Sequence, residues 1–523
     1  MSQEKKIMNA FGWQSINVFS QSILQLIFMS ILARLISPES FGVMAIVLMI
    51  TGFIDIFAQI GIGPAIIQRK DITPKQISSG FYLSSLLGLC FFGLVWVLAP
   101  KVASYYEYAE FTDLLRVIGI SFLISAVSIV PKSLLYKKLR FKELFISGFF
   151  GMLTGNIIIG LLLAFLDFEI WAYVAALLVQ NGVMTFFYWW YNPIKLDPKP
   201  TLKHAAPLVK YGGGSTLFNL FNYLSSKVDI FIVGTYSNLN QASEVAQSSW
   251  GTTGVYDQSL RVMSYPITII GKLSDSVMFS GLSMIQDQTE KLRYAFRTAF
   301  SVLTTISLPA SVFLVVYAQE VVLIILGDQY YGAIPIVQIL FIGLFLRTII
   351  KLCDAVVRAL DRVYTGALVK FIYFIAIAIS VYIIATDVSV DLGINMGLQG
   401  VAIALLVSVA LQFLIMLSIC ISILGLNLTS LLRLLYGPIS IAVFALIYCL
   451  GFRYVLEYLN LPVLINFLIG TLALALAYLS VIWFMPGVFG RGEHNMLNVL
   501  LRKLPAKSII KRLQERVEKK TTD

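Results

Sequence analysis

The hydrophobic positions of the chain form long, nearly uninterrupted runs that recur from Phe11 to Pro486 with short polar breaks between them. Each run has about 20 residues or more, the length that a helix needs to cross roughly 30 Å of hydrocarbon. Continuous runs differ from the alternating ten-residue pattern of membrane β-barrel strands. The pattern predicts an all-α integral membrane protein with 14 transmembrane helices, near residues 11–36, 41–67, 79–100, 114–131, 144–166, 169–192, 207–236, 254–285, 298–318, 333–357, 363–386, 396–424, 432–456 and 462–485.

The polar breaks indicate how the helices are grouped. The only proline-rich linker, at 192–200, follows the sixth predicted helix. Similar hydropathy and similar basic exits recur in the fourth and tenth helices, which favours two six-helix lobes in parallel repeat around a central site. The predicted parts are an N-terminal six-helix lobe at 1–192, a C-terminal six-helix lobe at 207–424, two extra transmembrane helices at 432–485 and a basic cytoplasmic tail at 486–523.

The distribution of charge predicts how the helices are oriented across the membrane. Hydrophobic residues make up 58% of the chain and charged residues only 13%, with a net charge of +11. Lysine and arginine gather in alternate breaks, which marks those breaks as cytoplasmic. Both termini are then predicted to be cytoplasmic, in a bacterial inner membrane. The positive charge follows from this topology and from attraction to anionic lipid, so nucleic acid is not an expected partner.

The residues that most enzymes need are scarce. The chain has two histidines and four cysteines, none with metal-ligand spacing. The glycine run at 212–214 lacks the Gly-Lys-Ser/Thr ending of a phosphate loop. No soluble domain fits into the short breaks. The sequence therefore predicts no metal, no cofactor and no catalytic residues, and a protein that is not an enzyme.

Charged residues inside the predicted helices are the strongest functional signal, because an ionisable side chain in a membrane usually faces a cavity or a partner. The candidate substrate-binding cations are Arg34, Lys227, Arg261, Lys272, Arg347 and Lys351. The candidate ion-coupling acids are Asp55, Asp229, Asp275 and Asp354.

Two interpretations of these charges remain open. The cations could line an aqueous cavity and hold a phosphate or diphosphate by charge-assisted hydrogen bonds while the rest of an amphiphile stays beside the protein. Alternatively, they pair internally, as Lys227 with Asp229, Arg261 with Asp257 at i,i+4, and Lys351 with Asp354 at i,i+3. An acid that is paired with a buried lysine would be structural.

Several stretches resemble a known family. They are Ala33-Arg34-Leu35-Ile36-Ser37-Pro38-Glu39-Ser40-Phe41-Gly42, Gly61-Ile62-Gly63-Pro64-Ala65-Ile66-Ile67-Gln68-Arg69-Lys70-Asp71, Leu134-Leu135-Tyr136-Lys137-Lys138-Leu139-Arg140-Phe141 and Gly254-Val255-Tyr256-Asp257. Over residues 5–430 the chain is similar to the bacterial polysaccharide transporters. These are the oligosaccharide or O-antigen flippases of the multidrug/oligosaccharidyl-lipid/polysaccharide exporter superfamily, and the colanic-acid-type subgroup is the most similar.

The resemblance implies two six-helix lobes around a cavity, and alternating-access flipping of a polyprenyl-diphosphate-linked oligosaccharide to the outer leaflet, for lipopolysaccharide, capsule or exopolysaccharide assembly. The implied partners are that glycolipid, the bilayer, and polysaccharide polymerase and assembly proteins. Two alternatives remain. A multidrug or cation antiporter of the same superfamily would favour a carboxylate-dominated cavity. A membrane glycan polymerase would need a sizeable charged outward loop, which the sequence lacks.

Overall fold

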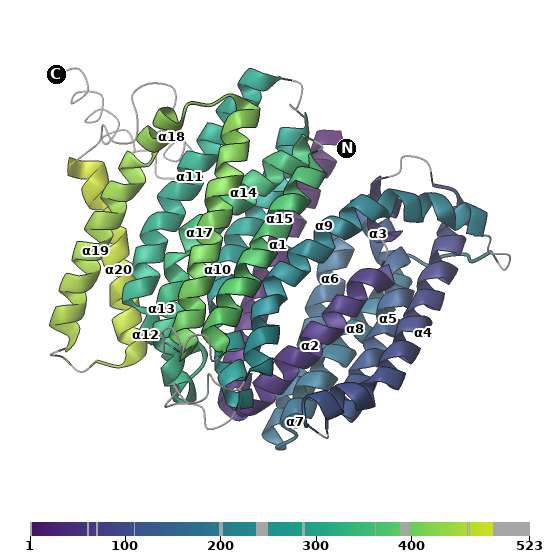
Figure 1. Cartoon of the computed structure of the whole chain (residues 1–523). Coiled ribbons are helices and arrows are strands. Elements are labelled where there is room, and N and C mark those ends of the chain that lie inside the picture. The colour runs from purple at the N-terminus through teal and green to yellow at the C-terminus, as the bar shows by residue number, and fades with distance from the viewer. Residues whose placement is uncertain are drawn as a thin grey trace. The chain divides into compact units, whose positions relative to one another are not determined.

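The computed structural model describes residues 3–59, 62–68, 72–108, 110–197, 202–236, 249–284, 288–360, 362–386, 397–457, 459 and 461–484. Regular structure in these ranges is helical, without strands (Figure 1). Among the described residues, 11 helices are long and apolar enough to cross a membrane. Two further segments, Asp328–Ile342 and Leu344–Ala359, are bent by 45° relative to each other, and they bring the number to 12 when they are counted as one span. The prediction of an all-α, multi-pass membrane protein is confirmed.

Each of the 14 predicted segments corresponds to a helix or to a broken helix. The seventh and eighth segments are α9 (Leu202–Thr235) and α10 (Ser249–Met284), long helices outside the 11 most apolar ones. Helix ends differ from the prediction by several residues. For example, α4 (Pro74–Tyr105) runs past Pro100, where the third segment was predicted to end.

The chain splits into two compact units. Unit 1 comprises residues 1–273, 325–336 and 362–408, and unit 2 comprises 274–324, 337–361 and 409–523. The predicted lobe boundaries at 192, 207, 424 and 432 stay a prediction. The basic tail predicted at 486–523 lies outside the described residues.

Unit 1 contains most of the first half of the chain. In it α4 packs along α5, and α9 packs along α15. Besides α4, α9 and most of α10, its helices are α1 (Gln3–Leu35), α2 (Pro38–Gln59), α3 (Ile62–Gln68), α5 (Phe111–Lys137), α6 (Phe141–Met152), η1 (Leu153–Gly160), α7 (Leu161–Phe165), α8 (Ile170–Tyr191), η3 (Asp328–Ala333), α15 (Val363–Ala385) and the first part of α17 (Gly397–Leu424).

Unit 2 is built around α11, along which α14 and α19 pack (Figure 1). The hairpin of α19 and α20 supplies the last two spans. The helices of the unit are α11 (Thr289–Val316), α12 (Ala318–Ile325), α13 (Ile334–Ile342), α14 (Leu344–Ala359), the second part of α17 (Gly397–Leu424), α18 (Leu428–Leu434), α19 (Tyr436–Glu457) and α20 (Val463–Phe484).

The fifth span is interrupted by the π-helix η1, which lies between α6 and α7. A π-helical stretch widens the helix locally and often marks a functional or packing constraint. Here Asn156 of η1 is buried, and its Nδ2 donates to Oε1 of Gln25 on α1 at 3.4 Å. A second polar contact on the same face of α1 joins Gln21 Nε2 to Asn17 Oδ1 at 2.9 Å. These two polar contacts were not predicted from the sequence.

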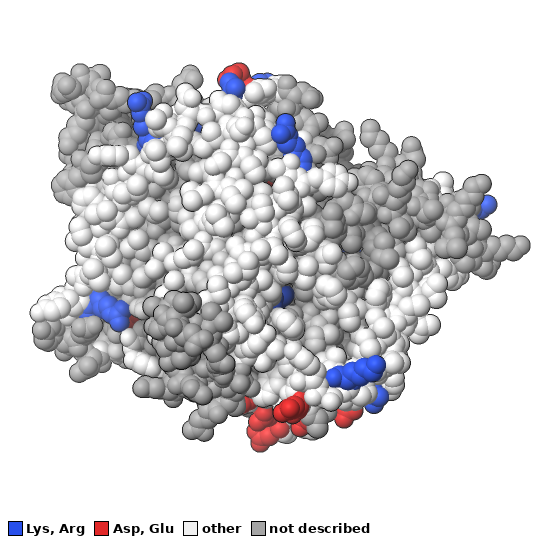
Figure 2. Space-filling model, viewed as in Figure 1, with Lys and Arg blue, Asp and Glu red and all other residues white. Residues whose placement is uncertain are grey.

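Among the described residues on the face shown in Figure 2, charged side chains are few and most of the residues are uncharged. Large apolar side chains such as Val407, Leu414, Leu468 and Leu472 are exposed in the described part of the chain. Exposed apolar surface of this extent needs lipid around it, in agreement with the hydropathy pattern.

Candidate functional site

Two of the stretches that carry the family resemblance meet where α2 crosses α10. A Cβ atom on Gly42 would overlap the backbone carbonyl oxygen of Trp250, and one on Gly254 would overlap the carbonyl oxygen of Pro38. Small residues allow helix backbones in a membrane to approach this closely. The two glycines therefore fix where α2 and α10 touch, and they place the polar residues that follow Gly254 inside unit 1.

The Trp250 ring closes one end of this crossing. It packs against Tyr106, Tyr108 and Phe111 at the turn between α4 and α5, with ring centroids 5.4 to 5.8 Å apart. Burial raises the pKa of the Tyr106 hydroxyl, so this residue stays neutral at ordinary pH. The four rings thus form an uncharged aromatic cluster at the helix ends.

Arg261 on α10 forms an ion pair inside unit 1. Its Nε lies 2.6 Å from Oδ2 of Asp257, one turn earlier, and its Nη1 donates to the hydroxyl of Tyr173 at 2.9 Å. Asp257 is almost fully buried, while the Arg261 side chain retains 23% of its exposure. The predicted i,i+4 pair is confirmed. Because the Asp257 charge offsets the Arg261 charge, the pair is suited to holding α10 against α8.

Asp229 on α9 is buried and faces α10. Its Oδ2 accepts a hydrogen bond from the Tyr256 hydroxyl at 2.9 Å, and its Oδ1 accepts one from the backbone N–H of Ile230 at 2.9 Å. The alternative in which Lys227 pairs with Asp229 is not observed. Lys227 is half-buried and makes no hydrogen bond or ion pair with a described residue.

Arg34 lies at the C-terminal end of α1 and binds backbone. Its Nη1 donates to the Ser30 carbonyl oxygen at 2.6 Å, to the Ser30 hydroxyl at 2.8 Å and to the Ile325 carbonyl oxygen at 3.4 Å. Gly327 follows in a left-handed conformation with φ of 91°, and a Cβ there would come within 3.2 Å of Cγ of Arg34. In this structure Arg34 joins α1 to the loop that precedes η3.

Asp55 on α2 is half-buried and interacts electrostatically with Lys132 on α5 and with Tyr223 on α9. The predicted span 114–131 ends just before Lys132, whereas α5 continues to Lys137 and includes this lysine. Tyr223 donates from its hydroxyl to the Met49 carbonyl oxygen at 2.7 Å, which ties α9 to α2. Lys132 is therefore a candidate that sequence reasoning missed because it ended the helix too early.

Lys370 on α15 was also missed. It is buried, with 7% of its surface exposed, in the helix that packs along α9. The signal was present in the sequence, because a lysine near the middle of the predicted span 363–386 is costly in a membrane. Near it Phe371 packs on Phe221 of α9, with ring centroids 5.1 Å apart.

Unit 2 contributes a charged stripe on one face of α14. Arg347, Lys351 and Asp354 follow one another at i, i+4 and i+7, which places them on the same side of the helix. All three are half-buried, whereas the intervening positions Thr348, Ile349, Ile350, Leu352 and Cys353 are buried. We call Arg347, Lys351 and Asp354 the α14 stripe. No ion pair joins Lys351 to Asp354 among the described contacts, so that alternative is not observed.

Two predicted site residues cannot be placed at the level of side chains. Lys272 and Asp275 belong to α10, but their side chains lie outside the described residues. The described residues contain no group of three or more histidine, cysteine or acidic side chains that could hold a metal ion.

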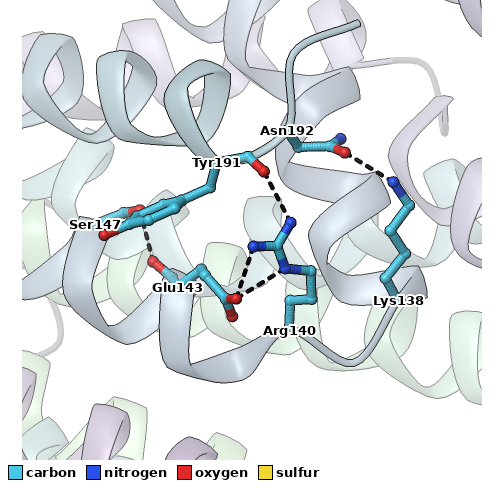
Figure 3. A network of polar contacts seen from close by, with 6 residues as sticks. All are labelled: Lys138, Arg140, Glu143, Ser147, Tyr191 and Asn192. Carbon is cyan, nitrogen blue, oxygen red and sulfur yellow. Dashed lines mark hydrogen bonds and ion pairs between the residues drawn. The ribbon is translucent and has the colours of Figure 1, made fainter.

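A third family-like stretch, 134–141, fixes the turn between α5 and α6 (Figure 3). Arg140 binds Oε1 of Glu143 through Nε and Nη2, both at 2.8 Å, and its Nη1 donates to the Tyr191 carbonyl oxygen at 2.8 Å. Lys138 Nζ donates to Oδ1 of Asn192 at 2.8 Å. The basic residues of this turn thus attach it to the end of α8. This contact is separate from the effect of their charge on membrane orientation.

Comparison with known proteins places these features in a family. Residues 31–335, more than half of the chain, match the model of the family described as "Polysaccharide biosynthesis protein". The lipopolysaccharide biosynthesis protein WzxC of Escherichia coli (strain K12) is 25% identical over 370 residues, which are 69% of this chain and 72% of that protein. The teichuronic acid biosynthesis protein TuaB of Bacillus subtilis (strain 168) is 23% identical over 68% of this chain and 72% of its own length.

Solved structures show the same fold. The lipid II flippase MurJ, in an inward closed conformation, superposes with a TM-score of 0.70 at 17% identity, covering 90% of this chain and 99% of that one. A multidrug resistance MATE family transporter of the MOP superfamily, facing inward, gives a TM-score of 0.61 at 18% identity over 79% of this chain and 99% of its own. At these identities the likeness establishes the fold alone, but the family match covers both helices of the glycine crossing, the Arg261 pair and the Arg140 turn. The chain belongs to the polysaccharide biosynthesis protein family.

Proposed function

We propose that this protein is a flippase that moves a polyprenyl-diphosphate-linked oligosaccharide from the cytoplasmic to the outer leaflet of the bacterial inner membrane by alternating access. Membership in a polysaccharide biosynthesis family supports the pathway. The relative ExoT of Rhizobium meliloti (strain 1021) is named a succinoglycan biosynthesis transport protein, and MurJ a lipid II flippase. The fold is therefore one that is used for carrying lipid-linked saccharides.

The single observation on this chain that supports the substrate class most is the α14 stripe. A charged side chain that faces hydrocarbon is costly, so half-exposed Arg347 and Lys351 in a membrane helix are best explained by an aqueous path. Two cations and one acid leave the stripe positive. Such a stripe attracts a diphosphate and repels a cationic drug, which favours the flippase over the antiporter.

The structure supports different roles for the other charged residues. Lys227 makes no hydrogen bond or ion pair with a described residue that would neutralise its charge, and buried Lys370 lies on the neighbouring helix of the same unit; both are candidates for binding the substrate within unit 1. Arg261 is paired with Asp257 and Arg34 binds backbone carbonyls, which supports structural roles for them. Asp55, close to Lys132, remains a candidate for ion coupling.

The protein acts as a transporter in this proposal and not as an enzyme. Its expected partners are the glycolipid, the bilayer, and polysaccharide polymerase and assembly proteins that receive the flipped unit. Both termini are proposed to be cytoplasmic, from the distribution of lysine and arginine in the breaks.

Lipid analysis of a deletion strain, with the two leaflets resolved, tests the proposal. We expect lipid-linked repeat units to accumulate on the cytoplasmic leaflet and surface polysaccharide to be lost, because in this proposal the lipid-linked oligosaccharide reaches the outer leaflet only through this protein. Accumulation of single, already flipped units on the outer leaflet would instead support a polymerase. Normal glycan export together with increased sensitivity to cationic drugs would support the antiporter.

A further inference from the structure

A cavity of about 340 Å³ lies inside unit 2, away from the α14 stripe. It is formed where the C-terminal end of α11 and the start of α12 meet the hairpin of α19 and α20. Its wall includes Tyr317, Glu320, Arg453 and Asn466. A water molecule occupies about 30 Å³ in the liquid, so the cavity has room for about ten non-hydrogen atoms. The proposed transport path does not use any of these residues.

Three residues on the wall of this cavity each have a buried polar atom that finds no hydrogen-bond partner among the described residues: the Tyr317 hydroxyl, Glu320 Oε2 and Asn466 Oδ1. Glu320 as a whole has only 7% of its surface exposed, and Tyr317 has none. Leaving such groups unsatisfied costs free energy, and more for a charged group. All three can accept a hydrogen bond. A primary ammonium carries three N–H donors on one atom, as many as there are acceptors here.

Arg453 defines the other part of the cavity. It donates from Nη1 to the Val316 carbonyl oxygen and from Nη2 to Oε1 of Gln319 at 3.1 Å. A guanidinium group is always protonated and has five N–H donors, so it disfavours a simple amine and favours an anionic group beside it. A cavity with a buried carboxylate and a guanidinium on its wall therefore fits a zwitterion with an ammonium group and a phosphate group.

The position of the cavity along the helices corresponds to lipid head groups. Tyr317 directly follows α11, Glu320 is in the first turn of α12, Arg453 lies four residues before the end of α19, and Asn466 is in the first turn of α20. These are the ends of spans, where hydrocarbon gives way to head groups. Exposed apolar residues of the same hairpin lie nearby for acyl chains: Val455, Leu464, Ile465 and Leu468.

The binding surface is rigid where α20 contacts Tyr317. A Cβ on Gly470 would come within 2.5 Å of Cζ of Tyr317, so only a glycine lets the helix lie flat on the ring. Phe313 also packs on Tyr317, with the two ring centroids 5.1 Å apart. The hydroxyl is thus held at the cavity wall by packing alone.

We propose that this cavity binds the head group of a bilayer phospholipid of the phosphatidylethanolamine type. The ammonium group donates to Glu320, Asn466 and the Tyr317 hydroxyl, and the phosphate lies beside Arg453. The bound lipid holds the α19–α20 hairpin to α11. This role is separate from glycolipid transport and does not depend on it.

Lipid binding by the purified, delipidated full-length protein tests the proposal, with native mass spectrometry as the readout. Dioleoyl phosphatidylethanolamine should bind about tenfold or more tightly than the phosphatidylcholine and phosphatidylglycerol analogues. Phosphatidylcholine is the sharp comparison, because its trimethylated ammonium keeps the charge but has no N–H donors. The variants Glu320→Gln and Tyr317→Phe should each reduce this preference.

Tyr478→Phe is the matched control, because it removes a hydroxyl from α20 that donates to the Thr305 carbonyl oxygen outside the cavity. It should keep the lipid preference. Equal binding of the three lipids, or an unchanged preference in correctly folded Glu320→Gln and Tyr317→Phe, would overturn the proposal. So would soluble phosphoethanolamine that competes as tightly as the lipid, since the ligand would then be a free metabolite. Binding is measured without transport, so these outcomes leave the flippase proposal untouched.

Discussion

At the crossing of α2 and α10, each helix presents a glycine to the backbone of the other. We expect Gly42→Ala or Gly254→Ala to destabilise the protein by about 1–3 kcal/mol or more, because the added methyl group meets backbone, which cannot rotate away. Unfolding of the purified protein in a denaturing detergent series measures the change.

Gly93→Ala is the control for this prediction. Nothing lies within 4 Å of a Cβ at Gly93, in the middle of α4. There alanine should be neutral or stabilising, by up to about 1 kcal/mol, because it has the higher helix propensity. Equal stability of Gly42→Ala and the unchanged protein would mean that the two helices do not touch at this point.

At the residue scale, the sequence identified several important positions, but it identified fewer of the contacts that these residues make. Gly42 and Gly254 stood in family-like stretches, but their contact joins helices more than 200 residues apart, and no local pattern reports it. The Arg261–Asp257 pair was predictable because both residues lie on one helix. Lys370 was visible in the sequence and overlooked, whereas Lys132 was lost through a helix end placed too early.

At the scale of elements, every one of the 14 apolar segments became a helix or a broken helix, because a continuous apolar run can satisfy its backbone hydrogen bonds in hydrocarbon by forming a helix. The breaks inside spans were not predicted. The tenth span bends by 45° at Gly343, and the fifth contains the π-helix η1. Such breaks depend on whether neighbouring helices provide hydrogen-bond partners for the backbone groups that the break frees. Hydropathy alone does not contain that information.

The α14 stripe gives the prediction for this scale. Arg347→Gln and Lys351→Gln should each lower the affinity for the diphosphate-linked substrate about 10- to 150-fold, since a charge-assisted contact contributes roughly 1.5–3 kcal/mol. Surface polysaccharide and membrane abundance, measured together in complemented deletion cells, separate a binding defect from misfolding. Neutral side chains also lower the cost of inserting the helix, so abundance should hold.

Arg433→Gln is the matched control for the stripe, because it removes one positive charge from an exposed position on α18 in the same unit. It should leave export unchanged. If both stripe variants exported glycan normally at normal abundance, α14 would not hold the substrate.

At the scale of the whole molecule, the fold class and the family were both within reach of the sequence, and both are confirmed. The predicted lobe boundaries stay a prediction. The compact unit that holds most of the first half of the chain also contains residues 325–336 and 362–408 from the second half. A repeat visible in the sequence reflects similar hydropathy in its two copies, whereas packing between helices depends on side-chain contacts such as Tyr223 with Met49.

The central claim is that this protein moves a glycan linked to a polyprenyl diphosphate across a bilayer. The most direct measurement uses the purified protein in vesicles that contain a labelled undecaprenyl-diphosphate-linked oligosaccharide in one leaflet. The account predicts that the label becomes accessible at the opposite leaflet only in vesicles that contain the protein, and more slowly with Lys351→Gln. No movement above that in empty vesicles, while ethidium-like cations cross in the same vesicles, would contradict it.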